Sequence, residues 1–141
     1  MSAEQILTEV AESKMPARSA EGSDTPNPRI VEAIGWVADG HAVVPLHYPD
    51  EASPGGCSCG KPDCSSVGKH PMTRRGLKEA LTDETQIRGY WERNPKANVG
   101  VVPAEGFFVV DVDPGSGGFE SLERIVEQVG PLDTRSYKTG S

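Results

Sequence analysis

The stretch CSCGKPDCSSVGKHP, residues 57–71, constrains the fold of this chain more than any other feature. It contains all three cysteines of the 141-residue chain, together with His70. This stretch and its flanks, residues 48–75, show no hydrophobic periodicity, and so long a loop in a compact domain needs a function or an organising ligand. Three cysteines cannot all pair internally, so in a reducing compartment their crowding favours metal binding over disulfides.

The loop offers three thiols and one imidazole as candidate zinc ligands: Cys57, Cys59, Cys64 and His70. Such ligands suit a structural zinc ion, and four of them can organise a loop that is too polar to form its own core. The Cys-x-Cys spacing is tighter than the usual Cys-x-x-Cys, and His41 and His47 compete in sequence for the fourth position. The pattern predicts a zinc loop, with three free thiols beside an unrelated histidine as the alternative.

Helix and strand patterns surround this loop. Asn27 as a cap and Pro28 as the first helical residue predict a helix that Gly40 ends. The run AVVPL predicts a strand that Pro45 places near a sheet edge or ends. The remaining patterns predict helical segments at 76–81 and 83–93, a hairpin of strands at 98–102 and 106–113 joined by the turn PAEG, and a last helix at 119–129.

The length and the net charge of the chain limit its domain organisation and the classes of function open to it. Residues 1–26 predict a flexible leader, in which 1–13 can form a short amphipathic helix, and 27–141 fit one domain. The net charge of -7 argues weakly against a protein that merely coats nucleic acid, but it allows an enzyme with cation-binding carboxylates. The longest apolar run is too short to span a bilayer, and the acidic start is unlike a signal peptide. We expect a cytoplasmic protein that neither spans nor binds a membrane.

A pair of acidic residues, Asp111 and Asp113, follows the apolar run FFVV. Strand residues two apart lie on the same side, about 6.5–7 Å apart along the chain, so both carboxylates can reach one hard cation or a pair of cations. Carboxylates together with substrate phosphates are the usual ligands of Mg²⁺, and Mn²⁺ suits the same site. The pair therefore predicts a divalent-cation site, whereas the alternative is that the acids cap the following turn.

Four basic residues fall within ten positions of an otherwise acidic chain: Lys69, Arg74, Arg75 and Lys78. A solvated charged face is the ordinary explanation for such a group. The alternative is that the zinc loop holds these cations opposite the carboxylate pair, where Lys69, Arg74 and Arg75 would bind the phosphates of a nucleotide.

Together these residues resemble the amino-terminal domain of the bifunctional DNA primase/polymerases, a branch of the archaeo-eukaryotic primase superfamily found in plasmid and viral replication proteins. The likeness follows the chain across residues 28–141, through GHAVVPL, GKHP, ANVGV and VVDVD. It implies an α/β (α+β) fold of the primase-polymerase type, with an incomplete RNA-recognition-type sheet and a zinc-binding loop.

The resemblance also implies roles for individual residues. Asp111 and Asp113 match the acidic pair that binds the divalent metals of nucleotidyl transfer, and the cysteine loop matches a zinc-binding insertion. The implied reaction is attack of a nucleotide 3′-hydroxyl on the α-phosphate of a nucleoside triphosphate. Nucleoside triphosphates and a DNA template and primer are the implied partners, with a downstream helicase domain or protein as a further one.

The likeness departs from the family at the end of the chain. The family continues past a segment like TRSYKTGS into a Gly-rich strand with a phosphate-binding histidine, and later supplies a third metal-binding acid. Because the sequence stops at Ser141, we expect a truncated chain with an exposed sheet edge that is inactive alone. Two alternatives remain: a non-catalytic zinc module that docks a replication protein or nucleic acid, and a fragment of a manganese-dependent nucleotide-sugar glycosyltransferase.

Overall fold

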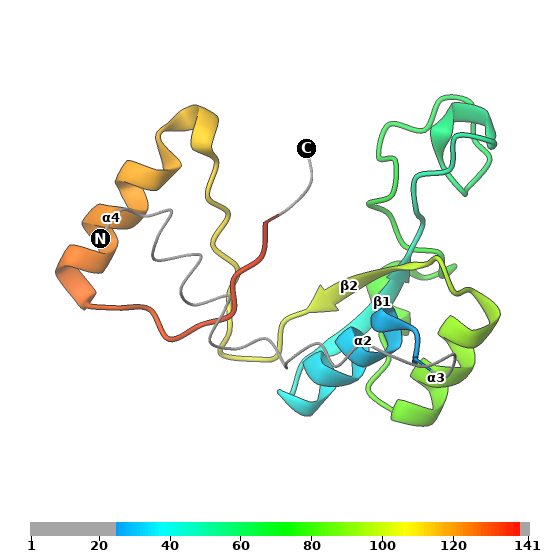
Figure 1. Ribbon diagram of the computed structural model, residues 1–141, viewed down its shortest axis with the longest axis horizontal. Coiled ribbons are helices and arrows are strands. Elements are labelled where there is room, and N and C mark those ends of the chain that lie inside the picture. Colours follow the sequence, from blue (N-terminus) through cyan, green and yellow to red (C-terminus); the bar gives the residue numbers. More distant parts are fainter. Residues whose placement is uncertain (1–24, 139–141) are drawn as a thin grey trace. The chain divides into compact units, whose positions relative to one another are not determined.

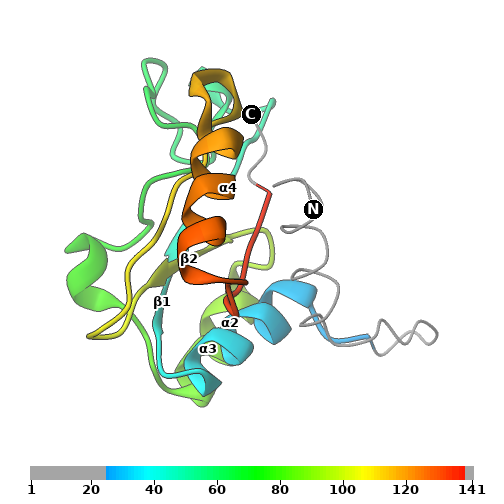
Figure 2. The same cartoon turned by 90° about the vertical axis from the view of Figure 1, so that its left-hand side faces the viewer.

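The computed structural model describes residues 25–138 of the chain. The predicted leader at 1–26 and its helix at 1–13 therefore lie outside the described residues, apart from Thr25 and Pro26. The chain forms two compact units, which divide between Phe108 and Val109. Figures 1 and 2 show that the first unit contains strands and helices and that the second is built around one helix.

The first unit contains a two-stranded antiparallel sheet. Its strands are β1 (Ala42–Leu46) and β2 (Asn98–Val102), paired so that Val44 lies opposite Gly100. A Cβ atom at Gly100 would lie 2.9 Å from Val44 Cγ1, so this register favours glycine at that position. Both strands lie where the sequence predicts them.

Two helices, α2 (Pro28–Ala38) and α3 (Glu84–Arg93), lie side by side and pack with the sheet (Figures 1 and 2). The buried residues that they share with the sheet form the core: Ile30, Ala33, Val43, Ile87, Trp91 and Ala97. The Asn27 side chain accepts the Arg29 N–H at 3.0 Å, and the Asp83 side chain accepts the Gln86 N–H at 2.9 Å. These caps satisfy donors that a helix start leaves free, which is why both helices begin as predicted.

Strand β1 is bonded along its second side as well. Val43 exchanges both main-chain hydrogen bonds with Leu81, the Pro45 carbonyl accepts the Met72 N–H at 2.9 Å, and the His47 N–H donates to the His70 carbonyl at 2.9 Å. The backbone groups of alternate strand residues point to opposite edges of the strand. The N–H that Pro45 lacks would have pointed to the irregular edge, so its absence leaves the pairing with β2 intact. The segment that returns from the cysteine loop therefore runs along β1.

Two elements differ from the sequence prediction. The helix predicted at 76–81 is only the 3₁₀ turn η2 (Gly76–Glu79), because the next residue is extended and Leu81 pairs with β1. The predicted hairpin is wrong, since β2 pairs with β1 and residues 106–113 contain no strand. Phe108 is 84% exposed there, and Phe and Val favour strands only where a neighbouring surface packs against them.

The second unit contains the 3₁₀ turn η3 (Pro114–Ser116) and the helix α4 (Gly118–Val129), which ends at Gly130 as predicted. Leu122 is its buried residue, whereas Ile125 is 44% exposed. The two units together give a mixed α/β fold, which confirms the predicted class. None of the helices within residues 25–138 has the length and apolar character that a membrane span requires.

Candidate metal centre

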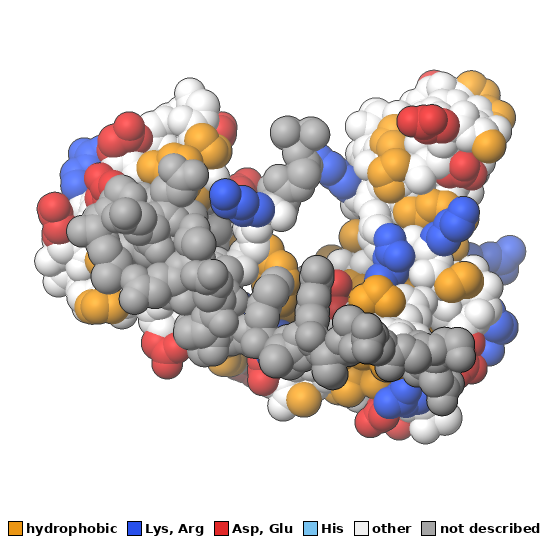
Figure 3. All heavy atoms as spheres, in the orientation of Figure 1, with side chains coloured by type: hydrophobic (Ala, Val, Ile, Leu, Met, Phe, Trp, Pro, Cys, Tyr) orange, Lys and Arg blue, Asp and Glu red, His pale blue; other side chains and the backbone are white. Residues whose placement is uncertain are grey.

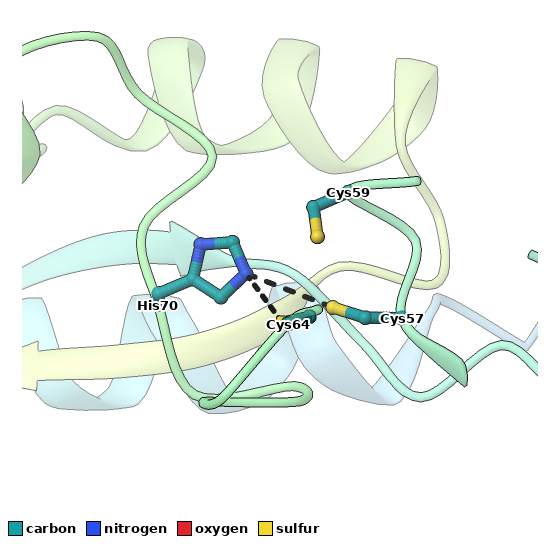
Figure 4. Close-up of side chains that lie close together, drawn as sticks. All are labelled: Cys57, Cys59, Cys64 and His70. Carbon is teal, nitrogen blue, oxygen red and sulfur yellow. Dashed lines mark hydrogen bonds between the residues drawn. The ribbon is translucent and has the colours of Figure 1, made fainter. Parts of the chain in front are cut away.

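The cysteine loop brings all four predicted zinc ligands together (Figure 4): Cys57, Cys59, Cys64 and His70. One ligand atom from each lies within 4.8 Å of the others. His70 Nε2 lies 3.7 Å from Cys57 Sγ and 3.6 Å from Cys64 Sγ. In the part of the chain that the structure describes, no other group of three or more His, Cys, Asp or Glu side chains gathers in this way.

The two distances between His70 and the cysteine sulfurs fit a tetrahedral zinc ion. Zinc binds sulfur at about 2.3 Å and nitrogen at about 2.0–2.1 Å, which places a sulfur and a nitrogen ligand about 3.6 Å apart in a tetrahedron. The two distances from His70 match this value. Since the protein supplies all four positions, the site is closed, as structural zinc sites are.

Backbone N–H groups favour the thiolate form of Cys57. The Cys57 sulfur accepts a hydrogen bond from the Cys59 N–H and further hydrogen bonds from the Gly68 N–H and the His70 ring. Together they lower the pKa of Cys57 to about 6. The Ser66 N–H also favours the thiolate of Cys64, but burial and the neighbouring thiols outweigh it and raise the pKa of Cys64. Donors aimed at sulfur favour the thiolate, which is the form that binds zinc.

The local fold explains how distant ligands meet. Residues 48–50 pair with 56–58, through the bridge between Pro49 and Cys57 and the bond from the Ser58 N–H to the Tyr48 carbonyl at 3.0 Å. This pairing contains Cys57, which is fully buried, and Cys59 follows it directly. His70 comes from the returning segment that is bonded to β1. The candidate centre therefore joins the loop to the edge of the sheet.

The other two histidines serve different contacts. The His47 Nδ1 atom lies 2.9 Å from Ser58 Oγ, and its ring packs against the His70 ring with centroids 4.5 Å apart. The buried His41 accepts the Ala104 N–H through Nδ1 at 3.1 Å. His70 is therefore the histidine that the structure places with the three thiols.

The acidic pair lies in the second unit and is exposed. Asp113 caps η3, since it accepts the Gly115 N–H and the Ser116 hydroxyl, both at 2.9 Å. Asp111 and Asp113 line a groove whose other walls come from the following turn and α4: Val110, Val112, Ser116, Gly118, Ser121, Leu122 and Ile125. The capping role foreseen as the alternative is thus present for Asp113, and the groove leaves room beside both acids.

The four basic residues lie in the first unit and are all exposed: Lys69, Arg74, Arg75 and Lys78. Several Lys and Arg side chains, drawn in blue, are visible on the face of this unit that Figure 3 shows. Arg75 is 74% exposed, and its Nε atom lies 3.8 Å from Glu79 Oε1. A screened contact of this kind holds the side chain weakly.

Comparison with known proteins identifies the family. The family model for the N-terminal domain of the bifunctional DNA primase/polymerases (Prim-Pol) matches residues 33–141, well over half of the chain. The chain belongs to the Prim-Pol family. No curated protein and no solved structure matches it. The Prim-Pol match includes the cysteine loop, the basic residues and the acidic pair, and it confirms the resemblance seen in the sequence.

Sequence reasoning missed two polar residues that support the Prim-Pol cysteine loop. Ser58 accepts the Tyr48 N–H at 3.1 Å and contacts His47, while Asn98 donates to main-chain carbonyls on both sides of the loop. One signal was available for Asn98, because asparagine is disfavoured in strands and yet begins the apolar run NVGVV.

Proposed function

We propose that residues 27–141 form a primase/polymerase domain that takes part in metal-dependent nucleotidyl transfer from nucleoside triphosphates, in the replication of a plasmid, phage or other mobile element. The observation that carries this proposal is the Prim-Pol match, which supports a role as a primase/polymerase nucleotidyltransferase. A DNA template and primer are the partners that this role requires.

We assign the divalent cation to Asp111 and Asp113. A carboxylate offers about four lone-pair positions, so the two hydrogen bonds that Asp113 accepts leave it able to bind a cation. Mg²⁺ commonly takes one or two carboxylates and completes its shell with waters and substrate phosphates. Two exposed acids beside a groove therefore suffice for Mg²⁺ or Mn²⁺ that arrives with a triphosphate.

The residues would contribute to the reaction by holding and orienting its reactants. Divalent cations bound there would activate the attacking 3′-hydroxyl and stabilise the leaving pyrophosphate. Lys69, Arg74 and Arg75 would bind phosphate oxygens, which their exposure permits. The zinc loop would fix the segment that carries these three cations, because Lys69 directly precedes the ligand His70.

The test is the binding of a nucleoside triphosphate in the presence of Mn²⁺, measured by calorimetry. Asp111→Asn and Asp113→Asn should each abolish the manganese-dependent part of binding while zinc content and circular dichroism stay unchanged. Glu127→Gln is the matched control, because it removes one exposed acid from α4 outside the groove. Binding that is unaffected by either Asp→Asn change would contradict the assignment.

One observation favours a second function. Asp113 caps η3 as a purely structural residue would, which is the behaviour expected of a non-catalytic zinc module that docks a replication protein or nucleic acid. Under this alternative the two Asp→Asn variants bind triphosphate and manganese as the unaltered protein does, and the zinc loop alone carries the interaction. The calorimetric comparison separates the two functions.

A further inference from the structure

Asn98 links the sheet to the cysteine loop through hydrogen bonds of its side chain. It is the first residue of β2, opposite Leu46 at the end of β1. Its Nδ2 atom donates to the Gly68 carbonyl at 3.1 Å and to the His47 carbonyl at 3.3 Å. The two carbonyls are 21 residues apart in sequence and belong to the outgoing and the returning side of the loop. One amide group therefore holds both ends of the loop on the sheet.

Each of the two carbonyls belongs to a residue that touches a different zinc ligand. The Gly68 N–H is hydrogen-bonded to the Cys57 sulfur. The His47 N–H donates to the His70 carbonyl at 2.9 Å, and the two imidazole rings lie against each other. Asn98 thus reaches a cysteine ligand through one residue, Gly68, and the histidine ligand through another, His47.

A second contact fixes the outgoing side of the loop. The Ser58 hydroxyl accepts the Tyr48 N–H at 3.1 Å and lies 2.9 Å from His47 Nδ1. Ser58 stands between two of the candidate ligands in the sequence, so this contact ties that part of the loop to the same histidine that Asn98 holds. The ligand set is therefore supported from the two residues that follow β1 and from the first residue of β2.

We propose that Asn98 is a positioning residue that couples metal binding in the cysteine loop to the β1–β2 sheet. The proposal rests on the zinc site of the proposed function and extends it to a residue that binds no metal itself. Supporting hydrogen bonds of this kind orient metal ligands before the metal arrives. Since coupling is reciprocal, whatever Asn98 adds to zinc affinity, zinc adds to the stability of the sheet that contains Asn98.

The test compares zinc release from the intact protein and from Asn98→Asp, which keeps the size of the side chain but cannot donate to the two carbonyls. Zinc is first counted in the purified protein, and its transfer to excess chelator is then followed in time. Asn98→Asp should release zinc about tenfold faster. Asn94→Ala is the control, because it also removes an Asn-to-carbonyl bond, here to Tyr90 at the end of α3. This control should leave the release rate within about twofold.

A second readout is specific to ligand geometry. Replacement of zinc by Co²⁺ gives a visible spectrum whose intensity reports a tetrahedral site, and Asn98→Asp should weaken or shift that spectrum whereas Asn94→Ala should not. Should Asn98→Asp fail to fold, hydrogen exchange on the unaltered protein decides: zinc removal should speed exchange at Val44 and Gly100 while leaving the amides of α4 unchanged.

The outcomes separate this inference from the zinc site itself. If the unaltered protein contains no zinc and takes up none, the zinc site and the coupling both fail. If it binds zinc, but Asn98→Asp releases the metal no faster than Asn94→Ala, the site stands and the coupling is refuted. Amide hydrogen exchange in β1 and β2 that proceeds at the same rate with and without zinc would likewise refute the coupling.

Discussion

Replacement of Gly68 by alanine should weaken zinc binding sharply. Gly68 has a backbone φ of +70°, where a side chain is strained, and its N–H bonds the Cys57 sulfur. A Cβ atom at this position would lie 2.8 Å from Cδ and 3.2 Å from Cγ of Pro49. These atoms belong to a ring that cannot rotate away, so either the ring or the backbone that faces Cys57 must shift.

The size of the effect follows from these two penalties. The left-handed backbone costs an alanine about 1–2 kcal/mol, and the overlap with Pro49 adds about 1–3 kcal/mol. The loop has no core of its own, so the metal-free loop can relax and most of the strain appears when zinc closes it. Since about 1.4 kcal/mol corresponds to a tenfold change in affinity, Gly68→Ala should weaken zinc binding by about thirtyfold or more.

Gly60→Ala is the matched control for this measurement. Gly60 lies in the same loop with the same φ of +70°, but a Cβ atom there would meet no atom within 4 Å. Gly60→Ala therefore incurs only the backbone penalty. Competition with a chelator of known affinity should show that Gly68→Ala binds zinc at least about fivefold more weakly than Gly60→Ala does. Equal affinities of the two variants would refute the reasoning from close packing at Gly68.

Three further predictions concern the ligand set and the core. His70→Ala should lose bound zinc and His41→Ala should retain it, as measured by elemental analysis after dialysis, because only the first lies with the thiols. Gly100→Ala should lower the free energy of unfolding in urea by about 1–3 kcal/mol through its clash within the sheet, whereas Gly35→Ala, in an open position on α2, should raise it by about 0.5–1 kcal/mol. Trp91→Phe removes the indole donor to a buried main-chain carbonyl and should lower the same free energy by about 1–3 kcal/mol.

The parts of the fold that could be predicted are those that local chemistry specifies. Asn27 and Asp83 satisfy the first free N–H groups of their helices within two or three residues, so the sequence alone identifies both starts. The gathering of the candidate zinc ligands could also be predicted, because so short a polar loop with three thiols has few other ways to become ordered. The choice of His70 over His47 needed the structure, since both histidines approach the loop.

The parts that could not be predicted depend on partners far away in the sequence. The apolar residues 107–110 have the composition of a strand, but pairing is decided by which neighbour is available, and β2 pairs with β1. Leu81 is extended because it bonds to Val43 across almost forty residues, which overrides its helical surroundings. The function of Asn98 was hidden for the same reason, since both carbonyls that it binds are remote from it in the chain.

The most direct test of the account is X-ray absorption at the zinc edge of the purified protein. We expect one zinc ion per chain with three sulfur ligands at about 2.3 Å and one nitrogen ligand at about 2.0–2.1 Å. We also expect His70→Ala to remove the nitrogen ligand or the metal. A shell of nitrogen and oxygen without sulfur, or a folded chain that takes up no zinc, would contradict the claim that these four residues form a metal centre.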